Sequence, residues 1–155
     1  MKEIIGDILS PASSGVQTIV CHQTNCLGVM GAGLARQIKA KHPNVYDEYR
    51  AKCDLIRAGI GGVGDVQYCN CHPSDGYIIA NVFGQYSYGR AVRHTNYKAL
   101  FRAFKQIRND FPYCTIRIPY KMGCGLAGGD WDVVAKIIEE TFGKDNPNVE
   151  IWKLP

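Results

Sequence analysis

Two glycine-rich segments, far apart in the chain, carry residue types suited to binding a phosphate. Residues 22–33 read His-Gln-Thr-Asn-Cys-Leu-Gly-Val-Met-Gly-Ala-Gly, and residues 121–129 read Lys-Met-Gly-Cys-Gly-Leu-Ala-Gly-Gly. Glycine lets a backbone approach a ligand closely, and a helix N-terminus offers unpaired N–H groups and a partial positive charge. Each segment follows an apolar run and precedes a helical pattern. Together the two segments predict a cleft in which both bind one diphosphate, one segment from each side.

The elements that must position these segments alternate between strand and helix patterns. Strands are expected at residues 4–9, 17–22, 65–71, 77–83, 114–119 and 149–154. Helices are expected at residues 32–41, 43–56, 95–110 and 131–142. The strands at 65–71 and 77–83 are joined by a short turn, His-Pro-Ser-Asp-Gly, which favours a hairpin.

This order predicts one α/β domain over residues 1–155, a three-layer α/β/α sandwich with a mixed, mostly parallel sheet. Ligands of such folds bind beyond the carboxyl ends of the strands. Both glycine-rich segments occupy positions of that kind.

Composition excludes several classes of protein. The 155 residues are 46% hydrophobic, enough for one sizeable core, yet no run of about 18 uncharged apolar residues predicts a membrane span. The first residues also lack the long apolar run of a signal peptide, so a cytoplasmic location is expected. The net charge of +4 favours an anionic ligand, but the charges are scattered, and no nucleic-acid partner is expected.

The seven cysteines are irregularly spaced, which favours reduced thiols in a reducing compartment. Two groups of potential metal ligands lie close in sequence: Cys69, Cys71 and His72, and Cys21, His22 and Cys26. Neither has the paired Cys-x-x-Cys spacing of a structural zinc site, so no metal is expected. Cys124 sits before a helix, where a thiol pKa can fall, but small thiols also fill such loops without reacting.

Three motifs in order along the chain resemble those of the macro domain, the ADP-ribose-binding α/β/α module. Gly6-Asp7-Ile8 resembles its early Gly-Asp-Ile turn. The first ligand loop of the family is matched by Asn25, Gly28, Gly31, Ala32 and Gly33. The second ligand loop is matched by Met122, Gly123, Cys124, Gly125 and Leu126.

The resemblance implies a role for each motif in binding ADP-ribose or a derivative. Asp7 would accept a hydrogen bond from the adenine amino group, and Ile8 would offer its backbone N–H. Asn25 would orient the distal ribose, and both loops would contact the diphosphate. No cofactor is implied, and an ADP-ribosylated protein is a further candidate partner.

Gly-Cys-Gly-Leu followed by Trp131 is similar to one branch of the family, which contains ADP-ribosyl hydrolases and an ADP-ribose-1″-phosphate phosphatase. Its glycohydrolases use a lysine and an aspartate where this chain has Gln85 and Ala127. The phosphatase-like pattern fits better, because a histidine precedes the loop asparagine and an acidic residue follows the second loop. The resemblance thus implies hydrolysis of a phosphoryl or acetyl group on the distal ribose, with three candidate catalytic residues: His22, Asn25 and Asp130.

Each of these residues also has a purely structural interpretation. Asp7 can be a turn residue, His22 a satisfied core histidine, and Asp130 a helix N-cap. Two other functions remain open at this point: a non-catalytic ADP-ribose-binding module, and an α/β domain that binds RNA or another nucleotide.

Overall fold

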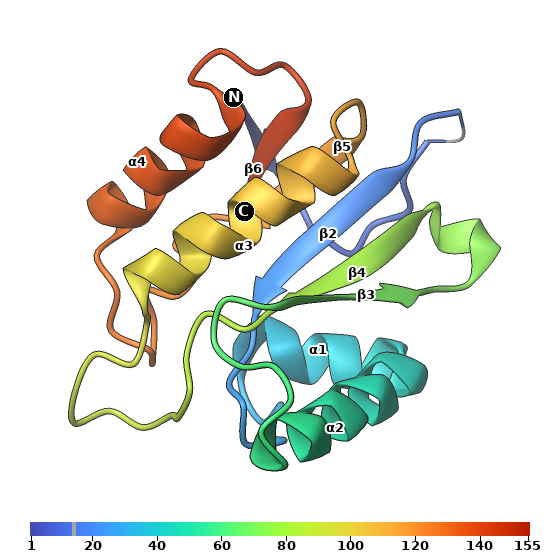
Figure 1. The fold of residues 1–155 in the computed structure, drawn as a ribbon. Coiled ribbons are helices and arrows are strands. Elements are labelled where there is room, and N and C mark those ends of the chain that lie inside the picture. The colour runs from blue at the N-terminus through green and yellow to red at the C-terminus, as the bar shows by residue number, and fades with distance from the viewer. Residues whose placement is uncertain (14) are drawn as a thin grey trace.

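In the computed structural model, which describes residues 1–13 and 15–155, a six-stranded sheet lies between two pairs of helices (Figure 1). The strands are β1 (Lys2–Ile5), β2 (Thr18–Gln23), β3 (Val66–Asn70), β4 (Tyr77–Val82), β5 (Thr115–Pro119) and β6 (Val149–Lys153). Their order across the sheet is β1-β6-β5-β2-β4-β3. All neighbours pair in parallel except β3 and β4, which form the expected antiparallel hairpin around the short 3-10 turn Pro73–Asp75.

Two helices cover each face of this sheet (Figure 1). Helices α1 (Gly33–Lys41) and α2 (Pro43–Arg57) lie on one side, and α3 (Tyr97–Asp110) and α4 (Trp131–Phe142) lie on the other. The predicted three-layer architecture with a mostly parallel sheet is therefore confirmed.

Strand β2 lies near the centre of the sheet and is buried on both faces. Ile19 and Cys21 pack into the core under α3 and α4, whereas Val20 packs with Ile38 of α1 on the opposite face. This two-sided burial explains why the strand reads as a continuous apolar run rather than an alternating one. The helices meet it with residues at three-to-four spacing, such as Leu100, Phe104 and Ile107 of α3.

The first strand is shorter than the expected 4–9, and that prediction was wrong beyond Ile5. The chain turns at Gly6 because Asp7 Oδ1 accepts a hydrogen bond from the Leu9 N–H at 2.9 Å, and Asp7 O accepts one from the Ser10 N–H at 3.0 Å. The apolar residues that suggested a strand, Ile8 and Leu9, are buried beneath this turn instead. Among the residues that the structure describes, no helix is long and apolar enough to cross a membrane.

Candidate functional site

A cavity of about 600 Å³ opens where the carboxyl ends of β2 and β5 meet. These strands are neighbours in the sheet, so the segments that follow them face each other. We call residues 25–33 the first loop and residues 121–129 the second loop. Residues lining the cavity are 22–25, 29–35, 85, 88–90, 119–123 and 125–127.

Both loops bring unpaired backbone donors to this one cavity. In the described part of the chain, no hydrogen-bond acceptor is found for the backbone N–H groups of Gly31, Ala32 and Gly33, at the start of α1. The same is true of Gly125, Leu126 and Ala127 in the second loop. Unpaired N–H groups on two separate loops that line one cavity form a site suited to an anion with more than one charged group.

The first loop is fixed by side chains, and Tyr49 of α2 is the principal one. Its buried hydroxyl donates to Asn25 Oδ1 at 2.6 Å and accepts from the Gly28 N–H at 3.2 Å. Asn25 Oδ1 also accepts from the Leu27 N–H, and Asn25 Nδ2 donates to the Val29 carbonyl at 2.8 Å. Asn25 lines the cavity, but most of its side-chain hydrogen-bonding capacity holds the loop.

The second loop is held by its own backbone turns and by one contact from the segment before α3. Thr95 Oγ1 donates to the Gly123 carbonyl at 2.6 Å. Gly123 has φ 73°, and a Cβ there would lie 2.5 Å from Gln23 Oε1 and 2.9 Å from Thr95 Oγ1. Glycine is therefore required both by the backbone conformation and by the close approach.

Gln23, the last residue of β2, is hydrogen-bonded to two residues that lie outside both loops. Its Nε2 donates to Thr95 Oγ1 at 2.9 Å and to Gln85 Oε1 at 2.8 Å. Gln85 lines the cavity, and its own amide donates to the Ser87 carbonyl. A neutral amide fixed in this way supplies no nucleophile to the cavity.

His22 lines the cavity and is only 2% exposed. Its Nε2 is hydrogen-bonded to Asn81 Oδ1 of β4, and no partner of Nδ1 is found in the described residues. Burial lowers the pKa of the imidazole to about 4, against the opposing effect of the Asn81 hydrogen bond. The ring is consequently neutral at pH 7 and offers one nitrogen as an acceptor.

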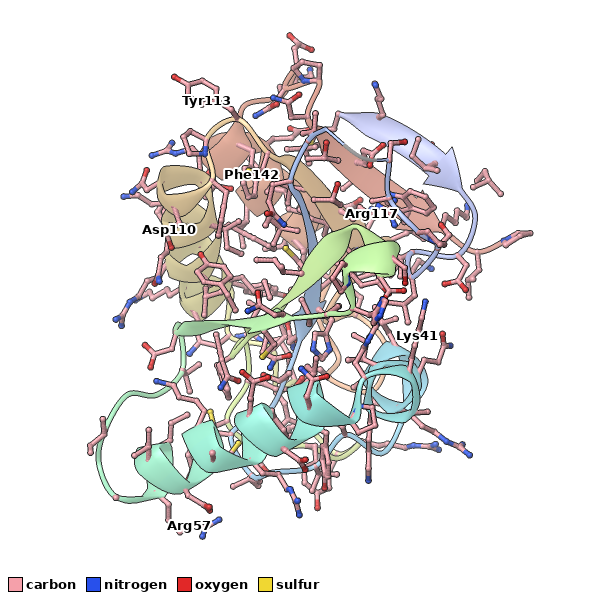
Figure 2. All side chains as sticks on the ribbon, turned by 90° about the vertical axis from the view of Figure 1, so that its right-hand side faces the viewer. Lys41, Arg57, Asp110, Tyr113, Arg117 and Phe142 are labelled. Atoms are coloured by element: carbon pink, nitrogen blue, oxygen red, sulfur yellow. The ribbon has the colours of Figure 1, made fainter. Side chains whose placement is uncertain are left out.

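The turn at Asp7 and Ile8 does not line the cavity. It is held from beneath by Arg117 of β5, whose guanidinium donates to the carbonyls of Ile8 and Ser10 at 2.9 and 2.6 Å. Lys41 at the end of α1 donates to the Leu9 carbonyl at 2.8 Å, and Figure 2 labels both of these basic residues. The exposed Asp7 carboxylate uses Oδ1 for the turn, and no partner of Oδ2 is found in residues 1–13 or 15–155.

Three other candidate residues also lie outside the lining: Gly28, Cys124 and Asp130. Asp130 is the N-cap of α4, where its exposed carboxylate accepts from the Asp132 N–H at 2.9 Å, the structural alternative considered for it. Cys124 turns its thiol to the Met122 carbonyl, and burial raises its pKa to about 11, which makes it a poor nucleophile. Gly28 is held by hydrogen bonds to the hydroxyls of Tyr46 and Tyr49, whereas Met122, Gly123, Gly125 and Leu126 line the cavity.

Sequence reasoning missed the three side chains that shape this site from outside the loops: Gln23, Tyr49 and Thr95. Tyr49 lies in the helix expected at residues 43–56, and its ring stacks on Phe83 with ring centroids 5.8 Å apart. The only signal for a second role was its hydroxyl, since a buried tyrosine hydroxyl needs a partner. Within the described residues no three metal-ligating side chains come together, and all seven cysteines are free thiols.

No family model matches the sequence, but two curated proteins are similar to it. An uncharacterized 17.5 kDa protein of phage T4 is 25% identical over 99% of this chain and 97% of its own length. An ADP-ribose 1″-phosphate phosphatase of Aspergillus oryzae is 37% identical over 57 residues, which are 37% of this chain and 27% of that protein.

Solved structures match along nearly the whole chain. A Bacteroides thetaiotaomicron protein superposes with a TM-score of 0.81 and 25% identity, covering 98% of both chains. A Streptomyces coelicolor macrodomain protein gives 0.77 and 24%, covering 98% of this chain and 97% of that one. Thermosipho africanus DarTG, solved in complex with ADP-ribose, gives 0.71 and 20%, covering 90% of this chain and 38% of that one. The chain has the fold of a macrodomain.

Proposed function

We propose that this chain binds ADP-ribose or a derivative of it in the cavity between the two loops. The observation that carries the proposal is that two sets of residues with unpaired N–H groups, Gly31–Gly33 in the first loop and Gly125–Ala127 in the second, line a single cavity. A volume of about 600 Å³ lies within the range of roughly 300–1,000 Å³ typical of small-ligand sites. The likeness to a structure solved with ADP-ribose supports the choice of ligand.

In this proposal the diphosphate lies between the loops and the distal ribose lies against the carboxyl end of β2. Asn25 and His22 then border the ribose, because both line that part of the cavity. The adenine extends beyond the cavity to the turn at Asp7, where Oδ2 accepts from the amino group. Arg90 and Lys121, which also line the cavity, add positive charge at its edge.

We further propose that the chain hydrolyses a group on the distal ribose. For a phosphate ester at C1″, a water oxygen bonds to phosphorus and the bond from phosphorus to O1″ breaks. A proton from the water ends on O1″, and the products are ADP-ribose and inorganic phosphate. His22 Nδ1 accepts the hydrogen bond that orients the water, and the loops stabilise the developing charge. The partial match to the Aspergillus phosphatase favours phosphoryl over acetyl as the group removed.

A non-catalytic binding module is the second candidate, and two specific observations favour it. The low pKa of His22 makes the imidazole a weak general base, and Asp130 is a helix cap outside the cavity. Neither observation weakens the case for binding, because in this proposal backbone donors hold the diphosphate.

Titration calorimetry and product analysis test both candidates. ADP-ribose should bind more tightly than ATP and than a short RNA, and loss of that preference would refute the ligand assignment. Phosphate release from ADP-ribose-1″-phosphate, or acetate release from O-acetyl-ADP-ribose, should disappear in His22→Ala but persist in Asp130→Ala. Tight binding of ADP-ribose with no turnover of either derivative would leave the binding module as the function.

A further inference from the structure

A series of three hydrogen bonds connects the backbone of α2 to the buried imidazole of His22 through the side chains of Gln67 and Asn81. The Glu48 carbonyl of α2 accepts from Gln67 Nε2 at 2.8 Å, and Gln67 Oε1 accepts from Asn81 Nδ2 at 3.0 Å. Asn81 Oδ1 then meets His22 Nε2 at 2.5 Å. The side chains come from β3, β4 and β2, which are consecutive in the sheet.

The Glu48 carbonyl at the start of this series determines which group donates and which accepts in every one of its hydrogen bonds. A backbone carbonyl can only accept, so the Gln67 amide must present its NH₂ to Glu48 and its oxygen to Asn81. Asn81 must then present its NH₂ to Gln67 and its oxygen to His22. An amide oxygen can only accept, so His22 Nε2 carries the proton. In a neutral ring Nδ1 is then a bare acceptor.

No described residue of the protein donates a hydrogen bond to this acceptor, His22 Nδ1. His22 Nδ1 is buried without a hydrogen-bond partner, a costly condition in a protein interior. The rest of the imidazole is fully accounted for, and His22 borders the cavity. A ligand or a water that donates a hydrogen bond would supply the missing partner.

We propose that Gln67 and Asn81 are positioning residues that hold His22 in the Nε2–H tautomer, so that Nδ1 accepts a hydrogen bond from an O–H group in the cavity. This rests on the proposed function for the identity of that group, a hydroxyl of the distal ribose or the reacting water. The tautomer itself does not depend on any ligand. Burial, which keeps the ring neutral at pH 7, supports the assignment.

Two substitutions at Gln67, to Glu and to Lys, should have opposite effects on the tautomer of His22. Both side chains fit this half-buried position on an edge strand. Gln67→Glu still accepts from Asn81 Nδ2, so the tautomer should be unchanged. Gln67→Lys can only donate, so Asn81 should rotate to present its oxygen to the lysine and its NH₂ to His22. Nε2 must then accept, and the proton should move to Nδ1.

The whole chain labelled with ¹⁵N-histidine allows the tautomer to be read directly from two-bond ¹H–¹⁵N correlations at pH 7. His22→Gln identifies the His22 signals among the four histidines. The wild type and Gln67→Glu should both show a protonated Nε2 and an unprotonated Nδ1, and Gln67→Lys should show the reverse. A wild-type ring protonated at Nδ1, a ring averaging between tautomers, or an unchanged tautomer in Gln67→Lys would overturn the inference.

Adding ligands to the same sample identifies the donor. A shift of the Nδ1 signal with ADP-ribose but not with ADP assigns the distal ribose hydroxyl, and a similar shift with both assigns a water. No shift with either, at concentrations where calorimetry shows saturation, would refute the acceptor role. If neither ligand binds, the proposed function fails while the tautomer result stands.

If phosphate release occurs, Gln67→Lys should lower kcat by roughly tenfold or more with KM little changed, and Gln67→Glu should retain kcat.

Discussion

The two loops present the same kind of backbone donor but are held in shape by different means. The first loop depends on side chains, chiefly Asn25 and the Tyr49 hydroxyl that reaches it from α2. The second depends on its own backbone, with turns such as that from the Gly129 N–H to the Gly123 carbonyl, and on glycine where a Cβ has no room. The difference implies that the first loop is sensitive to distant side chains and the second to its own backbone.

The largest expected effect is a loss of free energy of unfolding at acidic pH, caused by His22 near the end of β2, just before the first loop. The pKa of His22 is about 4 in the fold, against about 6.5 in an unfolded chain, so the unfolded state binds more protons between these values. The part of the free energy of unfolding that depends on a neutral His22 is complete above pH 6.5 and is lost as the pH falls toward 4. The wild type should lose about 3 kcal/mol more free energy of unfolding than His22→Gln between pH 7 and pH 4.

Urea denaturation of both proteins across this pH range measures the difference. The contributions of all other titratable groups are common to the two proteins and cancel in the comparison. Parallel curves for the wild type and His22→Gln would contradict the burial of a neutral imidazole.

Gly123→Ala should break the second loop while the first stays intact. The Cβ would meet Gln23 and Thr95 in a conformation with φ 73°, a strain of about 1–3 kcal/mol before any steric shift. Affinity for ADP-ribose should fall on the order of 10²-fold in calorimetry. Gly62→Ala is the matched control, because a Cβ there meets nothing within 4 Å, and it should bind as the wild type does. Equal affinity in both variants would show that the second loop does not contact the ligand.

Tyr49→Phe tests the side-chain support of the first loop. It keeps the ring stacked on Phe83 but leaves Asn25 Oδ1 and the Gly28 N–H without this buried partner, at about 1–3 kcal/mol. We expect a lower midpoint in thermal unfolding and an ADP-ribose affinity reduced about tenfold. Tyr46→Phe loses only a 3.3 Å bond to the Gly28 carbonyl and should change both quantities less. The reverse ranking would contradict the assigned role of Tyr49.

The smallest effect is expected at Asp7, beyond both loops. Asp7→Asn keeps an oxygen to accept from the Leu9 N–H but replaces the free Oδ2 with a donor, which the adenine amino group cannot use. Affinity for ADP-ribose should fall by about 1 kcal/mol while the free energy of unfolding stays the same. Asp7→Ala should lower both quantities. An unchanged affinity in both variants would leave Asp7 as a turn residue only.

Local sequence patterns predicted most of the fold because periodicity and turn chemistry are local. The hairpin between β3 and β4 and the position of both loops at one edge of the sheet were predicted correctly. The length of β1 was not, because the Asp7 side chain stabilises a turn where Ile8 and Leu9 suggested a strand.

The support of the site could not be predicted in the same way. Tyr49 lies 24 residues from Asn25 along the chain, and Asn81 lies 59 residues from His22. Their roles arise only when the sheet and helices bring them into contact, and no spacing rule relates them in sequence. Asp130 shows the opposite problem, since the residue type suited to catalysis is also the one preferred at a helix N-cap.

A crystal structure of the chain with ADP-ribose would show whether both loops bind the ligand. We expect the two phosphates between the backbone N–H groups of Gly31–Gly33 and those of Gly125–Ala127, with the distal ribose beside Asn25 and His22. A ligand bound elsewhere, or one whose diphosphate touches neither loop, would contradict it.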